Sequence, residues 1–235
     1  MAATRPGQQP QTNGNSNMSV HGSRAPGKIH GVPAEIAVEH HSSQTDVEID
    51  PESARWLTVS PYLEPEHLLD LNSVDTPHRL LALASTQLEP ASGKYAIVPY
   101  EDAFDWSSLM ATLKSLAAKE GYRWTRQEFY VVEFRSKLKK NIAVDLLFKL
   151  DKQSHVEATQ SGGLLKYWYG VPDTDRRNLA TCFWRNKEDA VNGGRGPWHK
   201  QARAAISSMY EEIDVKGLRF TIEDDVASWG FSPYA

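Results

Sequence analysis

The stretch that most constrains the fold of this chain covers residues 162–223. Two short runs rich in aromatic and β-branched residues, Leu164–Tyr169 and residues 179–185, flank a turn-forming segment. A long amphipathic segment follows, and an alternating run over residues 218–223 closes the stretch. The order strand, hairpin, strand, helix, strand is most of a split βαβ unit.

The preceding elements complete this unit. Apolar residues at offsets of three and four predict a helix over residues 105–120, with Asp105 as its N-cap. Residues 129–137 alternate like a strand, and residues 144–161 are predicted to be helical. From residue 129 onward the order is β-α-β-β-α-β, so we expect an α+β domain with a ferredoxin-like core.

We also expect an extra N-terminal strand and helix before this core. The run RLLALAST, residues 79–86, reads as a short strand, and the helix over residues 105–120 follows it. These elements lie outside the split βαβ unit. They are candidates to cover whichever face of the sheet the two core helices leave open.

The strand over residues 129–137 has two different faces. Tyr130, Val132 and Phe134 make one side wholly apolar, which suits a face under helices. The other side places Glu133 and Arg135 two residues apart, as in a strand that faces a cleft. Because an exposed aromatic sheet face is unusual on a monomer, we expect a second subunit or the N-terminal elements to cover it.

Composition divides the chain into a tail and one domain. The first fifty residues contain few large apolar side chains, so they cannot bury enough surface to offset the entropy of ordering. The expected organisation is a disordered tail (1–50) and a single domain (51–235), with an irregular arm (51–78), an N-terminal strand and helix (79–121), the core (127–224) and an aromatic C-terminal tail (225–235).

Charge and cysteine content exclude several classes of protein. A net charge of −4 does not favour nucleic acid or an anionic membrane. The one cysteine, Cys182, forms no internal disulfide and is expected to be a buried, inert thiol. No apolar run is long enough for a membrane span, and no secretory signal follows Met1. We therefore expect an intracellular protein of the cytoplasm, with the nucleus as an alternative.

The segment over residues 193–199 is the first candidate for chemistry. Gly194 and Gly196 let backbone amides approach a ligand just before a helix N-terminus, which favours an anion. Arg195 could add a bidentate contact, and His199 could transfer a proton near neutral pH. The alternative is a tight turn between two helices in which His199 only forms local hydrogen bonds.

A second candidate is an aromatic cleft. Trp168 and Trp184 would form its walls together with Phe129, and Glu133 and Arg135 would form its polar floor. The alternatives are core aromatics and a simple ion pair between Glu133 and Arg135.

A metal site has little support. His155 would have to meet His199 and either Glu157 or Glu133, and no short His-X-His or His-X-X-X-His spacing suggests this. We predict no metal and no organic cofactor.

Several motifs resemble known proteins. GGLLKYWYG, NLATCFWRNKEDA and GRGPWHKQARAA, with YEDAFDW and QEFYVVEFRSKLK, resemble a fungal family of uncharacterised proteins. More distantly, the chain is similar to the dimeric α+β-barrel superfamily, which includes antibiotic-biosynthesis monooxygenases. The resemblance implies a ferredoxin-like fold, a pocket between sheet and helices, and a homodimer. Some superfamily members bind haem through a histidine on the helix that here carries His199.

The resulting functional hypothesis is a cofactor-independent enzyme or small-molecule-binding protein with an apolar, anionic ligand of aromatic or polyketide-like type. The predicted catalytic residues are His199 and Glu133, and the predicted substrate-binding residues are Arg195, Arg185, Arg135, Trp168, Trp184, Trp198, Gly194 and Gly196. One alternative is a non-catalytic interaction protein that associates through its open sheet face. A third is a haem-binding protein.

Overall fold

The computed structural model describes residues 53–234. The predicted disordered tail, residues 1–50, lies outside the described residues. Within residues 53–234, no helix combines the length and the apolar character needed to cross a membrane.

A five-stranded antiparallel sheet forms the centre of the domain, with the strand order β4-β5-β3-β6-β7. The strands are β3 (Gln127–Leu138), β4 (Leu164–Tyr169), β5 (Arg177–Trp184), β6 (Tyr210–Ile222) and β7 (Trp229–Pro233). The first four, with helices α3 (Val144–Ser161) and α5 (Pro197–Met209), follow the predicted β-α-β-β-α-β order. The ferredoxin-like core is therefore confirmed, and the aromatic C-terminal tail adds the edge strand β7.

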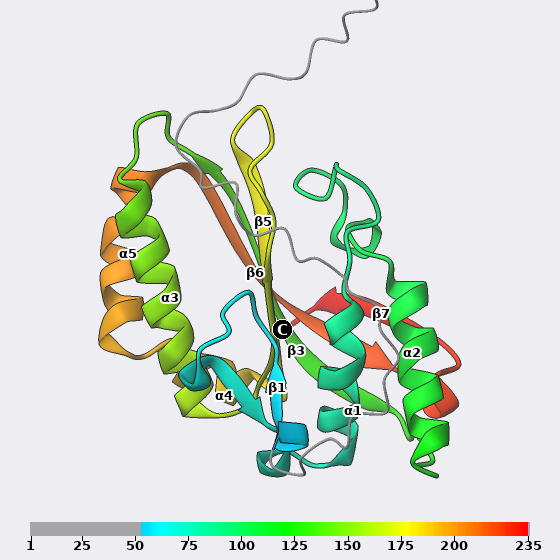
Figure 1. Ribbon diagram of the computed structural model, residues 1–235. Coiled ribbons are helices and arrows are strands. Elements are labelled where there is room, and N and C mark those ends of the chain that lie inside the picture. Colours follow the sequence, from blue (N-terminus) through cyan, green and yellow to red (C-terminus); the bar gives the residue numbers. More distant parts are fainter. Residues whose placement is uncertain (1–52, 235) are drawn as a thin grey trace, which may run out of the picture. The chain divides into compact units, whose positions relative to one another are not determined.

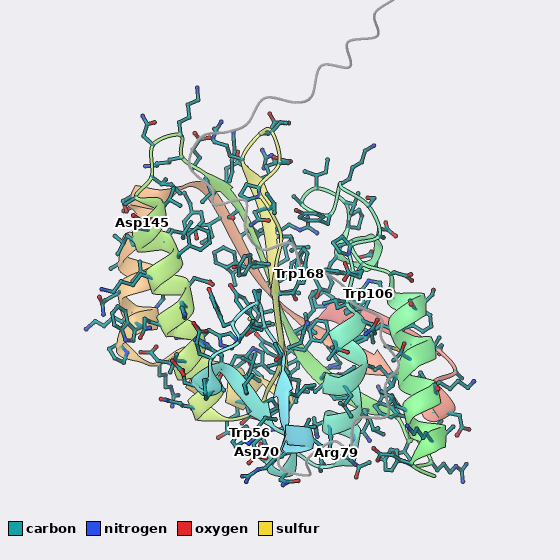
Figure 2. The ribbon with its side chains drawn as sticks, viewed as in Figure 1. Trp56, Asp70, Arg79, Trp106, Asp145 and Trp168 are labelled. Carbon is teal, nitrogen blue, oxygen red and sulfur yellow. The ribbon has the colours of Figure 1, made fainter. Side chains whose placement is uncertain are left out.

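Helices cover both faces of this sheet. Helices α3 and α5 pack together on one side, whereas α1 (Thr76–Ala84) and α2 (Trp106–Lys119) lie on the other (Figure 1). The short helix α4 (Lys187–Gly193) connects β5 to α5. Trp106 on α2 and Trp168 on β4 both belong to the α1/α2 side of the sheet (Figure 2).

The predicted strand over residues 79–86 is wrong, because residues 79–84 belong to helix α1 and a 3-10 turn follows from Ser85. Leucine and alanine favour helix over strand, and Pro77 fits the first turn of a helix, where its missing N–H is not needed. Leu80, Leu81 and Ala84 are buried, so the helix places its apolar side on the core. The extra N-terminal elements are thus two helices rather than a strand and a helix.

The arm before α1 is more ordered than predicted. Strands β1 (Trp56–Thr58) and β2 (Leu68–Asp70) pair as a small antiparallel ribbon. The backbone N–H of Tyr167 on β4 donates to the carbonyl oxygen of Val59 at 2.8 Å, which ties the arm to the edge of the large sheet. The arm also contacts α3, so it brings its own side chains to that helix.

The aromatic side of β3 that carries Phe129 is covered within the chain. Phe129 and Val131 are at most 1% exposed, and they form one apolar cluster with Leu81 of α1 and Leu109 of α2. Of the two predicted covers, a second subunit or the N-terminal elements, the structure has the N-terminal elements. Burial of this face needs no partner.

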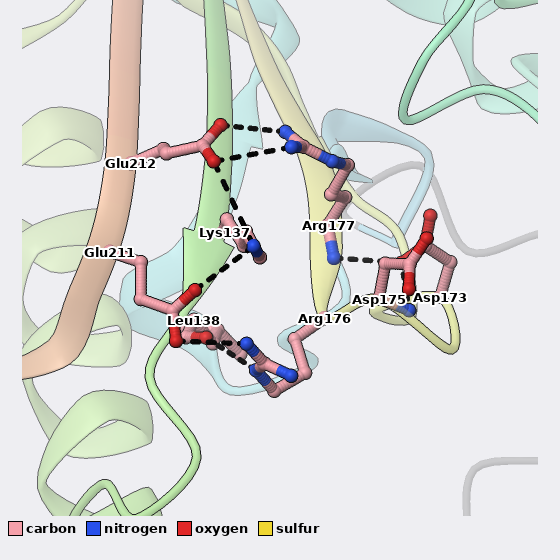
Figure 3. A network of polar contacts seen from close by, with 8 residues as sticks. All are labelled: Lys137, Leu138, Asp173, Asp175, Arg176, Arg177, Glu211 and Glu212. Carbon is pink, nitrogen blue, oxygen red and sulfur yellow. Dashed lines mark hydrogen bonds and ion pairs between the residues drawn. The ribbon is translucent and has the colours of Figure 1, made fainter.

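A network of ion pairs joins the turn ends of β3, β5 and β6 (Figure 3). The guanidinium of Arg177 donates to both carboxylate oxygens of Glu212, at 2.8 and 3.2 Å. Lys137 lies between Glu211 and Glu212, and Arg176 donates to Glu211 at 2.8 Å. Because these groups are partly solvent-accessible, the network contributes little to stability and mainly aligns the ends of β3, β5 and β6.

Candidate functional site

The N-terminus of helix α5 is already occupied by a carboxylate of the same chain. Glu157 on α3 accepts hydrogen bonds from the backbone N–H groups of Trp198 (2.6 Å) and His199 (3.0 Å). The imidazole Nδ1 of His199 lies 2.9 Å from Glu157 Oε2. Burial alone would raise the pKa of Glu157, but these hydrogen bonds and the neighbouring imidazole lower it. The anion expected at this helix end is therefore Glu157 itself.

The glycines of this segment serve the contact between α3 and α5. Gly196 is the N-cap residue of α5, and a Cβ atom there would collide with the Glu157 carboxylate. The carbonyl oxygen of Gly194 accepts from Arg203 at 2.8 Å, and Arg195 donates to the side chain of Asn192 at 3.0 Å. This arrangement corresponds to the local alternative, a tight turn between two helices.

The aromatic and cationic side chains that we predicted to bind substrate beside this segment contact neighbouring residues of the chain. Trp184 is 4% exposed and packs under Gly193, where a Cβ atom would meet its ring. Arg185 donates to Asp189 at 2.8 Å, and Lys149 lies 5.6 Å from the ring centroid of the half-buried Trp198. None of these contacts assigns a substrate-binding role, so the roles stay predictions.

Glu133 and Arg135 line a cleft, but its walls are not the predicted ones. Arg135 is ion-paired with Glu133, and its guanidinium also donates to the carbonyl oxygens of Tyr95 (3.3 Å) and Val98 (2.7 Å). The open cleft, of about 660 Å³, is bounded by residues 96–101 and by strands β6 and β7. The Glu133–Arg135 ion pair thus fastens this loop to the sheet.

The sheet separates one predicted aromatic wall, Trp184, from the other two, Trp168 and Phe129. Trp168 shares the Glu133 side and packs edge-on against Phe104, with ring centroids 4.9 Å apart. Trp184 lies opposite Tyr130 on the α3 side, and Phe129 is fully buried in the core. The prediction of one cleft lined by these three aromatics is wrong, because residues an odd number of positions apart along paired strands point to opposite faces.

A polar cluster that the sequence did not indicate lies between α3, the arm and β4. The carboxyl group of Asp151 accepts hydrogen bonds from the hydroxyl groups of Tyr62, on the arm, and Tyr167, on β4, the latter at 2.5 Å. One helical turn further along α3, His155 Nδ1 lies 2.8 Å from Nδ1 of His67, also on the arm. We call these five residues the Asp151 cluster.

The two histidines constrain one another. Because only one of two facing Nδ1 atoms can carry the proton in a hydrogen bond between neutral rings, the two imidazoles must be opposite tautomers. Both Nε2 atoms are buried and have no hydrogen-bond partner among the described residues. One of them is then an N–H donor and the other a lone-pair acceptor. Burial lowers the pKa of His155 to about 3, which keeps the ring neutral.

The carboxyl group at the centre of the cluster is also shifted toward its neutral form. Burial raises the pKa of Asp151, although the hydrogen bonds from Tyr167 and Tyr62 act in the opposite direction. Burial and the nearby carboxyl group raise the pKa of Tyr167 well above its ordinary value. Shifts of this kind, concentrated in one place, are typical of functional sites.

The surroundings of the Asp151 cluster are apolar but only half buried. Val132, Phe134 and Cys182 on this sheet face are partly accessible to water, and Val215 is 55% exposed. Burial raises the pKa of Cys182 to about 12, which keeps the thiol protonated near neutral pH, although the side chain is half buried and not fully buried as predicted. An apolar surface with a few polar groups is the kind of surface that small molecules contact.

The cluster does not form a metal site. Within residues 53–234, no group of three or more histidine, cysteine, aspartate or glutamate side chains is placed to hold a metal ion. His155 pairs with His67 instead of His199, and His199 pairs with Glu157. The haem hypothesis for His199 stays a prediction.

Comparisons with known proteins identify the family. The chain belongs to the PB2B2.08-like family, whose family model matches residues 58–233. It is 36% identical over 184 residues to the UPF0643 protein PB2B2.08 of Schizosaccharomyces pombe, an alignment that covers 75% of this chain and 84% of the relative. The family resemblance found in the motifs is thereby confirmed.

Two solved structures match the core weakly. A putative antibiotic biosynthesis monooxygenase from Nitrosomonas europaea is 14% identical, with a TM-score of 0.33, and covers 39% of this chain and 86% of its own. SnoaB, a cofactor-independent oxygenase from Streptomyces nogalater, is 10% identical, with a TM-score of 0.32, and covers 39% and 90%. The ferredoxin-like assignment of this chain rests on its own strand order rather than on these superpositions.

Proposed function

We propose that this member of the PB2B2.08-like family binds an apolar small molecule through an oxygen atom of the ligand. In this proposal the Asp151 cluster moves a proton to or from that oxygen without an organic cofactor. The observation that carries the proposal is the Asp151 carboxyl group, whose pKa is raised by burial while two tyrosine hydroxyl groups hold it in place.

The protonation state of Asp151 decides what the cluster can offer a ligand. When the carboxyl group is ionised, the two tyrosine protons are both used in hydrogen bonds to it. When it is neutral, the same three groups share one more proton, and one O–H can donate to a carbonyl or phenolate oxygen. Because burial raises the pKa of Asp151, its neutral form is more populated at a given pH than that of an exposed aspartate, and a neutral carboxyl group beside a tyrosine can stabilise an oxyanion in this way.

The side chains that surround the Asp151 cluster favour a ligand that is mainly apolar. The half-buried side chains around the cluster, Val132, Phe134 and Cys182, offer apolar contact without a fixed charge. The Nε2 atoms of His67 and His155, which form no hydrogen bond within residues 53–234, could hold a further polar group of the ligand or a water molecule. In this proposal Asp151 takes the proton-transfer role predicted for His199, because Glu157 holds the His199 imidazole.

Binding of 2-naphthol, compared with naphthalene, tests the proposal. The two probes share an apolar body, and only the first carries a hydroxyl group. We expect 2-naphthol to bind about tenfold more tightly than naphthalene, which corresponds to about 1.4 kcal/mol, measured by fluorescence titration. Asp151→Asn and Tyr167→Phe should remove this preference.

Tyr122→Phe is the matched control, because Tyr122 packs on the α1/α2 side of the sheet. It should leave the preference for 2-naphthol unchanged. The proposal fails if both probes bind the native protein equally, or if Asp151→Asn retains the preference while its thermal unfolding shows an intact fold.

The interaction-protein alternative relied on an open sheet face. Helices α1 and α2 cover the face on which Phe129 lies, so that surface is no longer free for association. The haem alternative is tested directly: a Soret band that appears on addition of haem, and is lost in His199→Ala, would support it.

A further inference from the structure

A second cleft lies on the α1/α2 side of the domain, away from the Asp151 cluster. It has a volume of about 490 Å³ and is lined by residues 89–91, residues 101–107 except Ala103, and Trp229. Four of the lining side chains are carboxylates, Glu89, Glu101, Asp102 and Asp105, and the lining contains no lysine, arginine or histidine. The potential in this cleft therefore favours a cation.

An unused hydrogen-bond donor lies in the same lining. Trp106 is 4% exposed, and its indole Nε1 has no hydrogen-bond partner among the described residues. A buried N–H group without a partner is uncommon, and this one is available to donate to an acceptor of a ligand. The ring itself is fixed, because it packs on Phe231 with centroids 4.7 Å apart and on Phe104 at 5.3 Å.

The free edge of the sheet runs past this cleft. Strand β7 is the last strand in the sheet order of the described residues, so one side of its backbone is not paired in the sheet. Trp229, the first residue of β7, is 37% exposed and lines the cleft. An unpaired edge is a site where an extended peptide can add as a further strand.

We propose that this cleft binds an extended peptide segment that carries a lysine or arginine side chain. The cationic side chain enters between Glu101 and Asp102, and a peptide carbonyl oxygen accepts the hydrogen bond from Trp106 Nε1. The backbone of the peptide follows the free edge of β7. Glu89 interacts electrostatically with Lys166 and Asp105 caps helix α2, so Glu101 and Asp102 carry most of the recognition.

Fluorescence polarisation with a labelled peptide of alternating valine and lysine tests the proposal on the full chain. We expect saturable binding that weakens as salt is added, because the contacts are charged and solvent-accessible. A peptide of alternating valine and glutamate should not bind. Equal binding of the two peptides would overturn the proposal.

Variants locate the site. Glu101→Gln combined with Asp102→Asn should weaken binding of the lysine peptide about tenfold or more, whereas Glu188→Gln, on the exposed surface of α4, should leave it unchanged. Trp106→Phe keeps an aromatic ring but removes the N–H, and it should weaken binding severalfold without changing the salt dependence.

Two further results would overturn the proposal. One is unchanged binding in the double variant, which is decisive even if Trp106→Phe does not fold, because Glu101 and Asp102 are exposed. The other is competition by free lysine amide as strong as that of the peptide, which would indicate a general cation site without peptide recognition.

Discussion

The two faces of the central sheet are covered to very different degrees. On the α1/α2 side, Phe129, Val131, Phe183 and Phe220 are at most 1% exposed and form one continuous core. On the α3/α5 side, the facing residues of β3 and β5 are largely half buried, and the fully buried apolar cluster is small, with Ala158, Leu164 and Trp184. One face therefore holds most of the buried apolar surface, and the other stays partly accessible to solvent.

Arg135 on one face and the Asp151 cluster on the other differ in how completely their hydrogen-bonding atoms are satisfied. Arg135 on the α1/α2 side has an acidic partner and two carbonyl acceptors, so its hydrogen bonds are used to fasten a loop. On the α3 side, the Asp151 cluster keeps two buried nitrogen atoms, Nε2 of His67 and of His155, that form no hydrogen bond among the described residues, although His67 Nε2 lies 3.9 Å from Glu64. Unsatisfied polar atoms lower stability, so their presence in the Asp151 cluster, as at Trp106 Nε1 on the other face, favours a functional role at these places.

The largest expected effect tests this difference in packing. Phe220→Ala, in the α1/α2 core, should lower the free energy of unfolding by about 3–5 kcal/mol, because it leaves a cavity in a closely packed region. Phe134→Ala, on the half-buried α3 side, should lower it by only about 1–2 kcal/mol. Chemical denaturation measures both values. Equal decreases in the free energy of unfolding would show that the two sheet faces contribute equally to stability.

The second prediction concerns acid stability on the α3 side. The pKa of His155 falls from its ordinary value of 6.5 to about 3 in the folded protein, so below pH 6.5 the unfolded chain takes up a proton that the folded chain does not. Stability should therefore decrease as the pH falls through this window, by up to about 1.4 kcal/mol per pH unit for this residue. Denaturation curves between these pH values measure the slope.

His155→Gln should flatten this slope, since glutamine can keep a hydrogen bond to His67 but does not titrate. The raised pKa of Asp151 acts in the opposite direction, because the folded chain then takes up a proton before the unfolded chain does. Asp151→Asn should accordingly make the acid slope steeper. Gln201→Asn, at an exposed position of α5, changes no titratable group and is the control that should leave the slope as it is. If His155→Gln keeps the pH slope of the native protein, the assignment of His67 and His155 as a neutral pair is contradicted.

The smallest predicted effect concerns the junction of α3 and α5. Glu157→Gln should lower the free energy of unfolding by about 1 kcal/mol, because the amide loses the charge that interacts with the α5 N-terminus and with His199. Glu188→Gln, in the first turn of α4, should change it by only a few tenths of a kcal/mol. If the free energy of unfolding falls equally in the two variants, Glu157 acts as an ordinary surface carboxylate.

Much of the fold could be predicted because its signals are local. The alternation in β3, the apolar stripe and N-cap of α2, and the glycine-separated helices α4 and α5 each follow from residues close together in the chain. The error at residues 79–86 has a local cause too. A short run of leucine and alanine fits either structure by hydrophobicity, and the helix propensity of these residues together with Pro77 decides for α1.

The candidate site was less predictable, because its contacts are distant in sequence. Tyr62 reaches Asp151 across 89 positions, His67 reaches His155 across 88, and Glu157 reaches His199 across 42. Asp151 and His155 are spaced like neighbours on one helix side, next to the buried Leu150 and Ala158. That placement of polar residues beside an apolar stripe was the available signal.

The sequence by itself determined the order and type of most elements, since periodicity, caps and turn residues act over a few positions. Only the tertiary structure decided that α1 and α2 close one sheet face, that Glu157 fills the N-terminus of α5, and that two tyrosines meet Asp151. These outcomes depend on which distant surfaces pack together. Burial then sets the pKa of each group, and no local pattern contains that information.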